Sequence, residues 1–221
     1  MKALRQLLAE YLGTALIVAT VLGAGHMVVA LEAPVALGLL MIAICVGAVL
    51  FGSIAALAPI SGAHFNPLVS LAFALRGEME AKRFIGYTIA QLLGAVSGSA
   101  LANLMFEKAP FTLSTVDRVG TGVFIGEVLA TFGLVLLILL LVDKSAHLIP
   151  AAVALWIVAG HIFTSSTSFA NPAVSLGRML SDAPSSISPA SMPGYLLAQG
   201  LGLALAVLVS KILNDKKAEH V

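Results

Sequence analysis

The sequence has very few charged residues: Asp, Glu, Lys and Arg together make up 10% of its 221 residues. Soluble domains carry about 25%, and 59% of this chain is hydrophobic, so an integral membrane protein is the class that fits. The net charge of +1 gives no basis for nucleic-acid binding. Cysteine occurs once, at Cys45 in an apolar segment, which excludes an intrachain disulfide and predicts a packing role.

The sequence also lacks the short motifs by which catalytic sites are usually recognised. It has no Gly-x-Ser-x-Gly turn, no His-Glu-x-x-His helix and no glycine loop that would hold a phosphate. The methionines are scattered and form no stripe that would indicate a site. We therefore expect a protein that is not an enzyme and that has no cofactor and no metal.

Six apolar stretches are long enough to cross about 30 Å of hydrocarbon. Lys2 and Arg5 precede the first stretch, as in a signal peptide, but Glu10 interrupts it, and this favours a retained first span. We expect spanning helices at approximately residues 6–27, 34–57, 83–106, 120–142, 147–164 and 192–212.

The chain, taken as a single domain over residues 1–221, consists of two related halves at about 1–110 and 118–214. A glutamate opens each half, an Asn-Pro run follows the second span, and an Ala-Gln pair begins the third. Three spans per half is an odd number, so the halves must be inverted, an arrangement that places a shared site near the midplane. The paired markers are Glu10 and Glu127, Asn66 and Asn171, and Gln91 and Gln199.

The two Asn-Pro runs, Asn66-Pro67-Leu68-Val69-Ser70-Leu71 and Asn171-Pro172-Ala173-Val174-Ser175-Leu176, differ in one position. Asparagine caps helices and proline suits the first helical position, so we expect half-helices at 66–76 and 171–181. Polar backbone precedes both, and it is tolerated at membrane depth only where it is buried in protein or lines water. Two such segments that enter from opposite faces would meet at the centre of a pore, with their carbonyls along its wall.

Each helix start carries about half a positive charge. Two of them would repel a monovalent cation at about 5 Å by about 3 kcal/mol, with an effective dielectric constant near 20. The amides of Asn66 and Asn171 could donate to a passing water or hydroxyl, which predicts a channel for small uncharged solutes. A secondary transporter is the alternative class, but coupling generally needs ionisable residues near the midplane, and Glu10 and Glu127 lie near span starts.

The cationic residues predict the orientation, because cytoplasmic segments carry an excess of Lys and Arg. We expect a multi-pass protein of the cell inner (plasma) membrane, surrounded by lipids, with both termini in the cytoplasm. Nine cationic residues would then lie inside and three outside. The nine are Lys2, Arg5, Arg76, Lys82, Arg83, Lys144, Lys211, Lys216 and Lys217, and the three are Lys108, Arg118 and Arg178.

The run Ser61-Gly62-Ala63-His64-Phe65-Asn66-Pro67 and the second Asn-Pro-Ala resemble the aquaporin (major intrinsic protein) family. The resemblance covers nearly the whole chain. It implies an all-α membrane protein with six tilted helices, two re-entrant half-helices, a pore in each subunit and a homotetramer. Glu10 and Glu127 would hold the pore loops, unless they are snorkelling or helix-start charges. The implied loop lining is Gly62, Ala63, His64, Phe65, Thr167, Phe169 and Ala170, and the implied pore centre is Asn66, Pro67, Leu68, Asn171, Pro172 and Ala173.

The chain departs from the family pattern at two places. Leu68 replaces the usual alanine, and Val174 stands where the family's outer constriction normally has an arginine. The expected selectivity filter is Val46, Ala159 (or Gly160 or His161 if the alignment shifts), Ser168 and Val174. For His161 a packed, hydrogen-bonded role is favoured over one that faces the pore.

Such a filter would be wide and mostly apolar, which favours an aquaglyceroporin-like channel for glycerol-like polyols as well as water, with a water-only channel as the alternative. The stretch from Phe163 to Val174 also resembles a bacterial subgroup associated with arsenic-resistance operons. That resemblance implies passage of neutral trivalent arsenicals, and arsenous acid is an uncharged trihydroxy molecule of roughly glycerol's shape.

Overall fold

The computed structural model describes residues 1–214, and within this range all regular structure is helical. Six segments are long and apolar enough to cross a membrane, which confirms the expected spans. Lys216, Lys217 and the C-terminus lie outside the described residues. The spanning helices are α1 (Lys2–Ala30), α2 (Val35–Ser61), α4 (Ala81–Met105), α5 (Thr121–Leu141), α6 (Ile149–Phe163) and α8 (Met192–Leu213), and short 3-10 turns precede two of them, η1 (Ala146–Leu148) and η2 (Pro189–Ser191).

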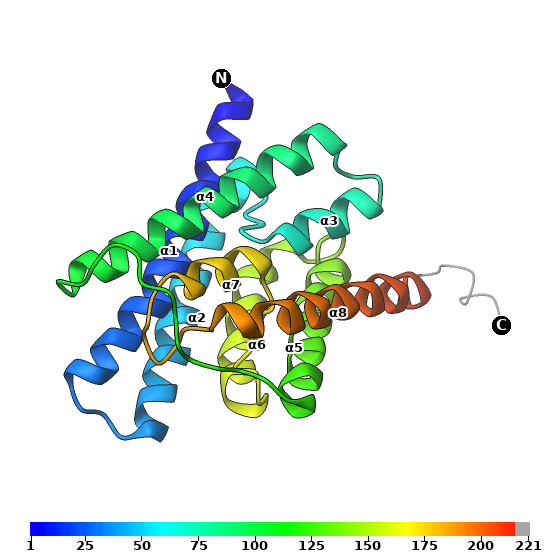
Figure 1. Ribbon diagram of the computed structural model, residues 1–221. Coiled ribbons are helices and arrows are strands. Elements are labelled where there is room, and N and C mark those ends of the chain that lie inside the picture. Colours follow the sequence, from blue (N-terminus) through cyan, green and yellow to red (C-terminus); the bar gives the residue numbers. More distant parts are fainter. Residues whose placement is uncertain (215–221) are drawn as a thin grey trace.

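Two short helices, α3 (Pro67–Leu75) and α7 (Pro172–Met179), begin at the Asn-Pro runs and lie among the long helices (Figure 1). Both start because an asparagine side chain caps the free amides of the first turn. Asn66 Oδ1 accepts from the Leu68 amide at 2.9 Å, and Asn171 Oδ1 accepts from the Ala173 amide at 3.0 Å. Both helices end one or two residues before the predicted boundaries.

The long helices form two close pairs, α1 with α4 and α5 with α8 (Figure 1). Glycines permit this close approach, as is common between helices in membranes. A Cβ atom on Gly94 of α4 would collide with the Tyr11 carbonyl of α1, and one on Gly202 of α8 would lie 2.6 Å from the Val128 carbonyl oxygen of α5. The two helix pairs therefore have a glycine at corresponding positions of their contact.

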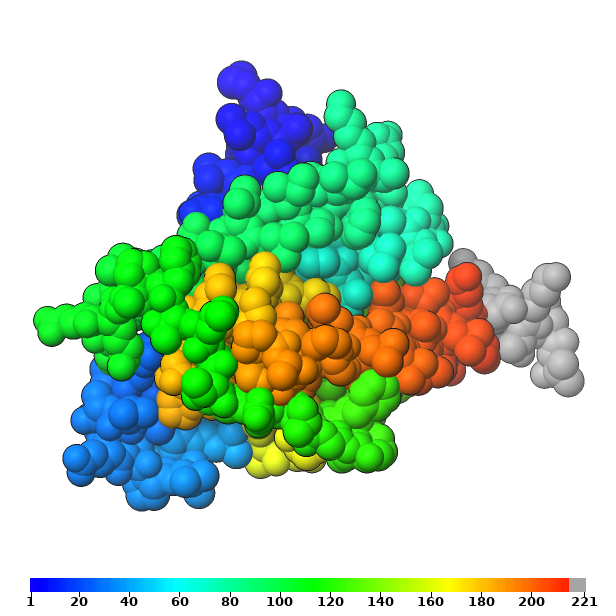
Figure 2. All heavy atoms as spheres, in the orientation of Figure 1, coloured from blue at the N-terminus to red at the C-terminus, as the bar shows by residue number. Residues whose placement is uncertain are grey.

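The loops gather on two opposite faces of the helix bundle. Arg76, after α3, donates to Asp143, after α5, at 2.7 Å, and these turns lie on what we call the N-terminal face. On the far face, the segment 106–120 crosses the surface against residues 179–191 (Figure 2). There the Thr115 amide donates to Asp182 at 2.8 Å, which ties the segment to the loop that follows α7.

Large apolar side chains are exposed along the outer sides of the spanning helices. Leu93 on α4, Leu155 on α6 and Leu197 on α8 each expose more than half of their surface. Cys45 is also exposed on α2, so the expected packing role within the chain is wrong. An apolar exterior of this kind suits contact with lipid or with another subunit.

The close approach of α1 and α4 gives a testable expectation. Gly94→Ala should lower the stability of the detergent-solubilised protein by about 1–3 kcal/mol, since the new methyl group forces two backbones apart. Gly200→Ala is the matched control, because nothing lies within 4 Å of a Cβ atom at that helical position. The stability of both variants is measured as the apparent midpoint of thermal unfolding. Equal midpoints for the two variants would contradict this account of the helix pair.

Candidate functional site

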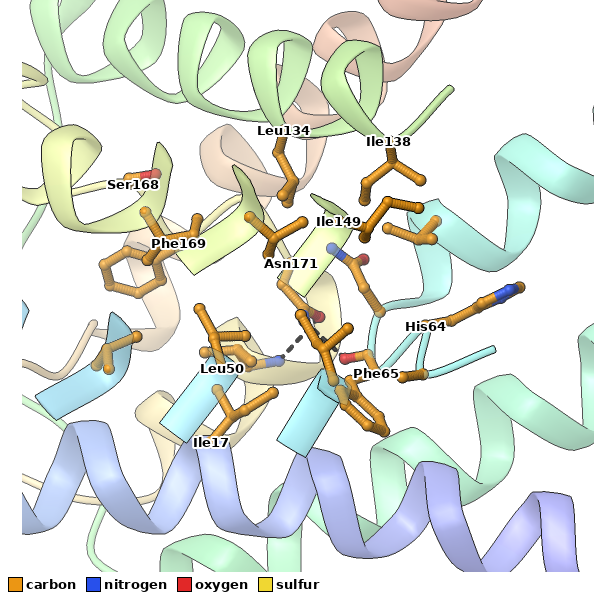
Figure 3. A pocket seen from close by; sticks show the side chains of 18 of the residues that line it. Ile17, Leu50, His64, Phe65, Leu134, Ile138, Ile149, Ser168, Phe169 and Asn171 are labelled. Atoms are coloured by element: carbon orange, nitrogen blue, oxygen red, sulfur yellow. Dashed lines mark hydrogen bonds between the residues drawn. The ribbon is translucent and has the colours of Figure 1, made fainter. Parts of the chain in front are cut away.

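The two re-entrant loops are joined to each other at the centre of the molecule. Asn66 Nδ2 donates to the Ala170 carbonyl at 2.7 Å. Asn171 Nδ2 donates to the Phe65 carbonyl at 2.8 Å (Figure 3). The N-termini of α3 and α7 therefore abut. Because an amide group has two N–H donors, each asparagine retains one, and both residues line the same cavity.

The first loop is held by the fully buried carboxylate of Glu10. Its oxygens accept from the amides of His64 at 3.0 Å and Phe65 at 2.7 Å. They also accept from the Ser61 hydroxyl at 2.6 Å and from Gln91 Nε2 at 2.8 Å. Four donors thus surround one carboxylate, which compensates for its removal from water.

The second loop has the same arrangement around Glu127, which is also fully buried. Its oxygens accept from the amides of Ala170 at 2.6 Å and Phe169 at 3.2 Å. Gln199 Nε2 donates to Glu127 at 2.7 Å and to Ser175 Oγ at 3.0 Å, as Gln91 does in the first half. The glutamate and glutamine markers that recur along the sequence are therefore members of two equivalent hydrogen-bond networks.

These networks determine where the loop carbonyls point. In a planar trans peptide the C=O points opposite to the N–H. Since the amides of residues 64, 65, 169 and 170 face the glutamates, the carbonyls of Ala63, His64, Ser168 and Phe169 face away from them. Left-handed φ angles near +50° at Ala63, Phe65, Ser168 and Ala170 make this possible, and such angles are costly without the surrounding contacts.

The cavity has a polar wall of loop residues and an apolar wall of helices. The apolar side chains are spaced four residues apart, so each helix presents one narrow row. In Figure 3, Leu134, Ile138 and Ile149 lie on one side of Asn171, and Ile17 and Leu50 lie on another. The complete rows are Ile17 and Val21, Val46, Leu50 and Ile54, Leu134, Ile138 and Val142, and Ile149, Val153 and Ile157.

The residues expected at the outer constriction are divided between the cavity and other places. Val46, Ser168 and Val174 line the cavity. Ala159 does not, because it lies on the exposed side of α6. Gly160 is buried behind the lining, where a Cβ atom would come within 2.6 Å of Ser168 Oγ. His161 occupies the lining position, one turn after Ile157.

The remaining predicted residues have varied positions. Gly62, Ala63, His64, Phe65 and Phe169 line the cavity, with His64 at one end and Phe169 at the other (Figure 3). Thr167 lines a second, neighbouring pocket on the far face, which we call the hollow. Pro67 and Pro172 are the first residues of their helices. Ala170 and Ala173 are buried. Leu68 packs with Leu139 and Leu203 in a separate apolar cluster, so it does not narrow the cavity.

Arg178 is a cavity residue that the sequence reasoning missed. The sequence analysis counts it only among the three cationic residues outside the membrane, yet it is 2% exposed and lines both the pore cavity and the hollow above it. The available signal was its spacing, since it follows Val174 by four residues and therefore lies on the same face of α7. Arg118 lies nearby in the 106–120 segment, where burial lowers the pKa of its guanidinium from the ordinary value.

The carboxylate networks give a second prediction. Glu127→Gln should destabilise the protein by about 1–3 kcal/mol and reduce its water permeability, because an amide NH₂ would face N–H donors of the loop. Stopped-flow light scattering on proteoliposomes and the thermal midpoint measure the two effects. Glu80→Gln is the control, since Glu80 is exposed and makes no capping bond to α4. Wild-type values for Glu127→Gln would show that the carboxylate does not position the loop.

Comparisons with known proteins agree with this geometry. Residues 1–182 match the family model described as major intrinsic protein. The chain is 44% identical over 209 residues to the aquaglyceroporin AqpS of Rhizobium meliloti, covering 95% of this chain and 90% of that protein. It is 31% identical to the glycerol uptake facilitator protein-like 6 of Lactiplantibacillus plantarum, covering 96% and 100%.

Among solved structures, the fold matches that of the aquaglyceroporin from Plasmodium falciparum with a TM-score of 0.76, at 22% identity, over 97% of this chain and 96% of that one. The family consists of channels, not enzymes. The re-entrant loops, the paired Asn-Pro starts and these matches together identify the chain as a member of the major intrinsic protein (aquaporin) family.

Proposed function

We propose that this protein is a passive channel with a wide outer opening that conducts glycerol-like polyols and neutral trivalent arsenicals as well as water. The observation that supports this most directly is the composition of the constriction. Val46 and Val174 are short aliphatic side chains, Ser168 is small, and His161 occupies the fourth lining position. Such a lining leaves room for a solute larger than water, and the two valines present an apolar surface to its carbon atoms.

The two-sided cavity supports a mechanism for passage. A solute that leaves bulk water loses hydrogen bonds, and the loop carbonyls replace them along one wall. At the centre, the free N–H groups of Asn66 and Asn171 bind one oxygen of the solute. The positive ends of α3 and α7 lie at the same level and oppose cations there. An uncharged molecule therefore exchanges its hydrogen bonds stepwise.

The solute class follows from the same chemistry. Glycerol and arsenous acid are both uncharged, both carry three hydroxyl groups, and both are of similar size. Hydroxyls can donate to the carbonyl wall and accept from the asparagines, while the rest of the molecule contacts the apolar rows. The names of the two relatives, an aquaglyceroporin and a glycerol uptake facilitator-like protein, favour polyols over water alone.

We also propose the arrangement of the protein in its membrane. The two equivalent networks at Glu10 and Glu127 support an inverted repeat, with halves at about 1–110 and 118–214. The excess of cationic residues near the N-terminal face favours a cytoplasmic location for that face in the plasma membrane. The exposed apolar helix surfaces suit a homotetramer in which each subunit has its own pore.

Stopped-flow light scattering on reconstituted vesicles tests the function. A wide channel should pass water, glycerol and arsenous acid along their gradients, without saturation and independently of a proton gradient. Empty vesicles give the background. Saturating, proton-dependent flux would identify a secondary transporter instead, and water flux without glycerol flux would identify a water-only channel.

Val174→Arg should narrow the opening. We expect glycerol flux to fall about tenfold, which corresponds to about 1.4 kcal/mol of added barrier, while water flux stays within about twofold. Val119→Arg is the control, because it adds the same charge at a residue that is 70% exposed and outside the cavity lining. Unchanged glycerol flux in Val174→Arg would remove Val174 from the filter.

A further inference from the structure

Arg178 is placed where it can act on a passing solute. It follows Val174 by one turn of α7 and lines both the pore cavity and the hollow on the far face, so it lies where the two spaces meet. Its side chain is almost completely enclosed, at 2% exposure. A buried guanidinium at the opening of a pore is a strong local charge, because little water screens it.

The contacts of Arg178 in the described chain include an aromatic ring and a carbonyl but no carboxylate. Nε donates to the Ser185 carbonyl, and the guanidinium carbon lies 3.2 Å from the centre of the Phe169 ring. Among residues 1–214, the ion pairs found involve Arg76, and none involves Arg178. In the same range no protein acceptor is found for its two terminal amino groups. Four N–H donors therefore remain for a ligand.

Two further buried polar atoms of this cavity lack a partner, and they belong to His161 and Ser168. His161 Nδ1 lies 2.8 Å from the Ile157 carbonyl oxygen. A carbonyl only accepts, so Nδ1 carries the proton and Nε2 of the neutral ring is an acceptor. Neither His161 Nε2 nor Ser168 Oγ has a hydrogen-bond partner within the described chain. Buried polar atoms are normally paired, so His161 Nε2 indicates a ligand position, whereas Ser168 Oγ lies over Gly160.

We propose that Arg178 supplies, one turn farther along α7, the pore-facing positive charge that position 174 lacks. Together with His161 it forms a hydrogen-bonding pair for neutral polyhydroxy solutes. Arg178 donates to a solute oxygen, and His161 Nε2 accepts from a hydroxyl. The same charge repels cations before they reach the asparagines. The polyol part of this inference rests on the proposed function, whereas the repulsion of cations does not.

Two small residues lie beside this pair. Gly160 leaves the space that Ser168 Oγ occupies, since a Cβ atom there would lie 2.6 Å from that oxygen. Val174 is short, so the longer Arg178 side chain reaches the lining from the next turn. Moving the charge by one turn shifts it about 6 Å toward the far face. The opening can thus be wide at Val174 while the guanidinium of Arg178 still repels cations.

The test compares Arg178→Met with Arg178→Lys in proteoliposomes. Methionine keeps a contact with the Phe169 ring but removes the charge. We expect the sodium and proton leak of Arg178→Met to rise on the order of tenfold, and its preference for glycerol over propanediol to fall. Arg178→Lys should keep the leak low. Lys108→Met, which removes an exposed cation from the same face, should behave as wild type.

A folded Arg178→Met protein with the wild-type leak would overturn the role of Arg178 in repelling cations. If methionine prevents assembly, Arg178→Gln removes the charge with a side chain that still donates hydrogen bonds, and the same outcomes apply. His161→Leu should lower glycerol flux without a leak, and unchanged flux would overturn the pairing of Arg178 with His161. Wild-type protein that passes water but no glycerol would refute the proposed solute class, and the leak measurements would still decide the role of Arg178.

Discussion

The structure depends on two carboxylates that are buried at membrane depth. Non-helical backbone has no water to bind there, and each free N–H group would cost several kcal/mol. Glu10 and Glu127 solve this problem because each accepts two consecutive loop amides. Once the amides face inward, the carbonyls must face the cavity. The polar wall of the pore is therefore a consequence of where the negative charges lie.

The two halves of the chain stabilise their buried charges and helix ends in the same way. Each carboxylate is surrounded by donors, including a glutamine that also contacts a serine of the adjoining half-helix. The half-helices in turn present their positive ends to each other, and the asparagines join the loops in both directions. Loosening one loop would therefore disturb the other. The centre of the pore is formed by both halves and belongs to neither alone.

In the proposed channel, selectivity is distributed along the pore. The apolar rows contact the non-polar part of a solute, and the carbonyl groups of the opposite wall replace part of its hydration. Charge enters at two levels, at the helix ends near Asn66 and Asn171 and at Arg178 toward the far face. In this proposal the opening is broad at Val174, while the positive charge of Arg178 lies one helical turn away, close to the path of the solute.

The six spans, the half-helix starts and the pairing of the two loops could be predicted from the sequence, because they follow from local hydropathy, capping and a repeated motif. Which side of each helix faces the cavity depends on how the helices pack against one another. A shift of one residue rotates a side chain by about 100° around the helix axis, which is why Ala159 lies outside and His161 inside. The burial of Arg178, the outward packing of Leu68 and the exposure of Cys45 likewise depend on neighbours distant in sequence, which no local pattern specifies.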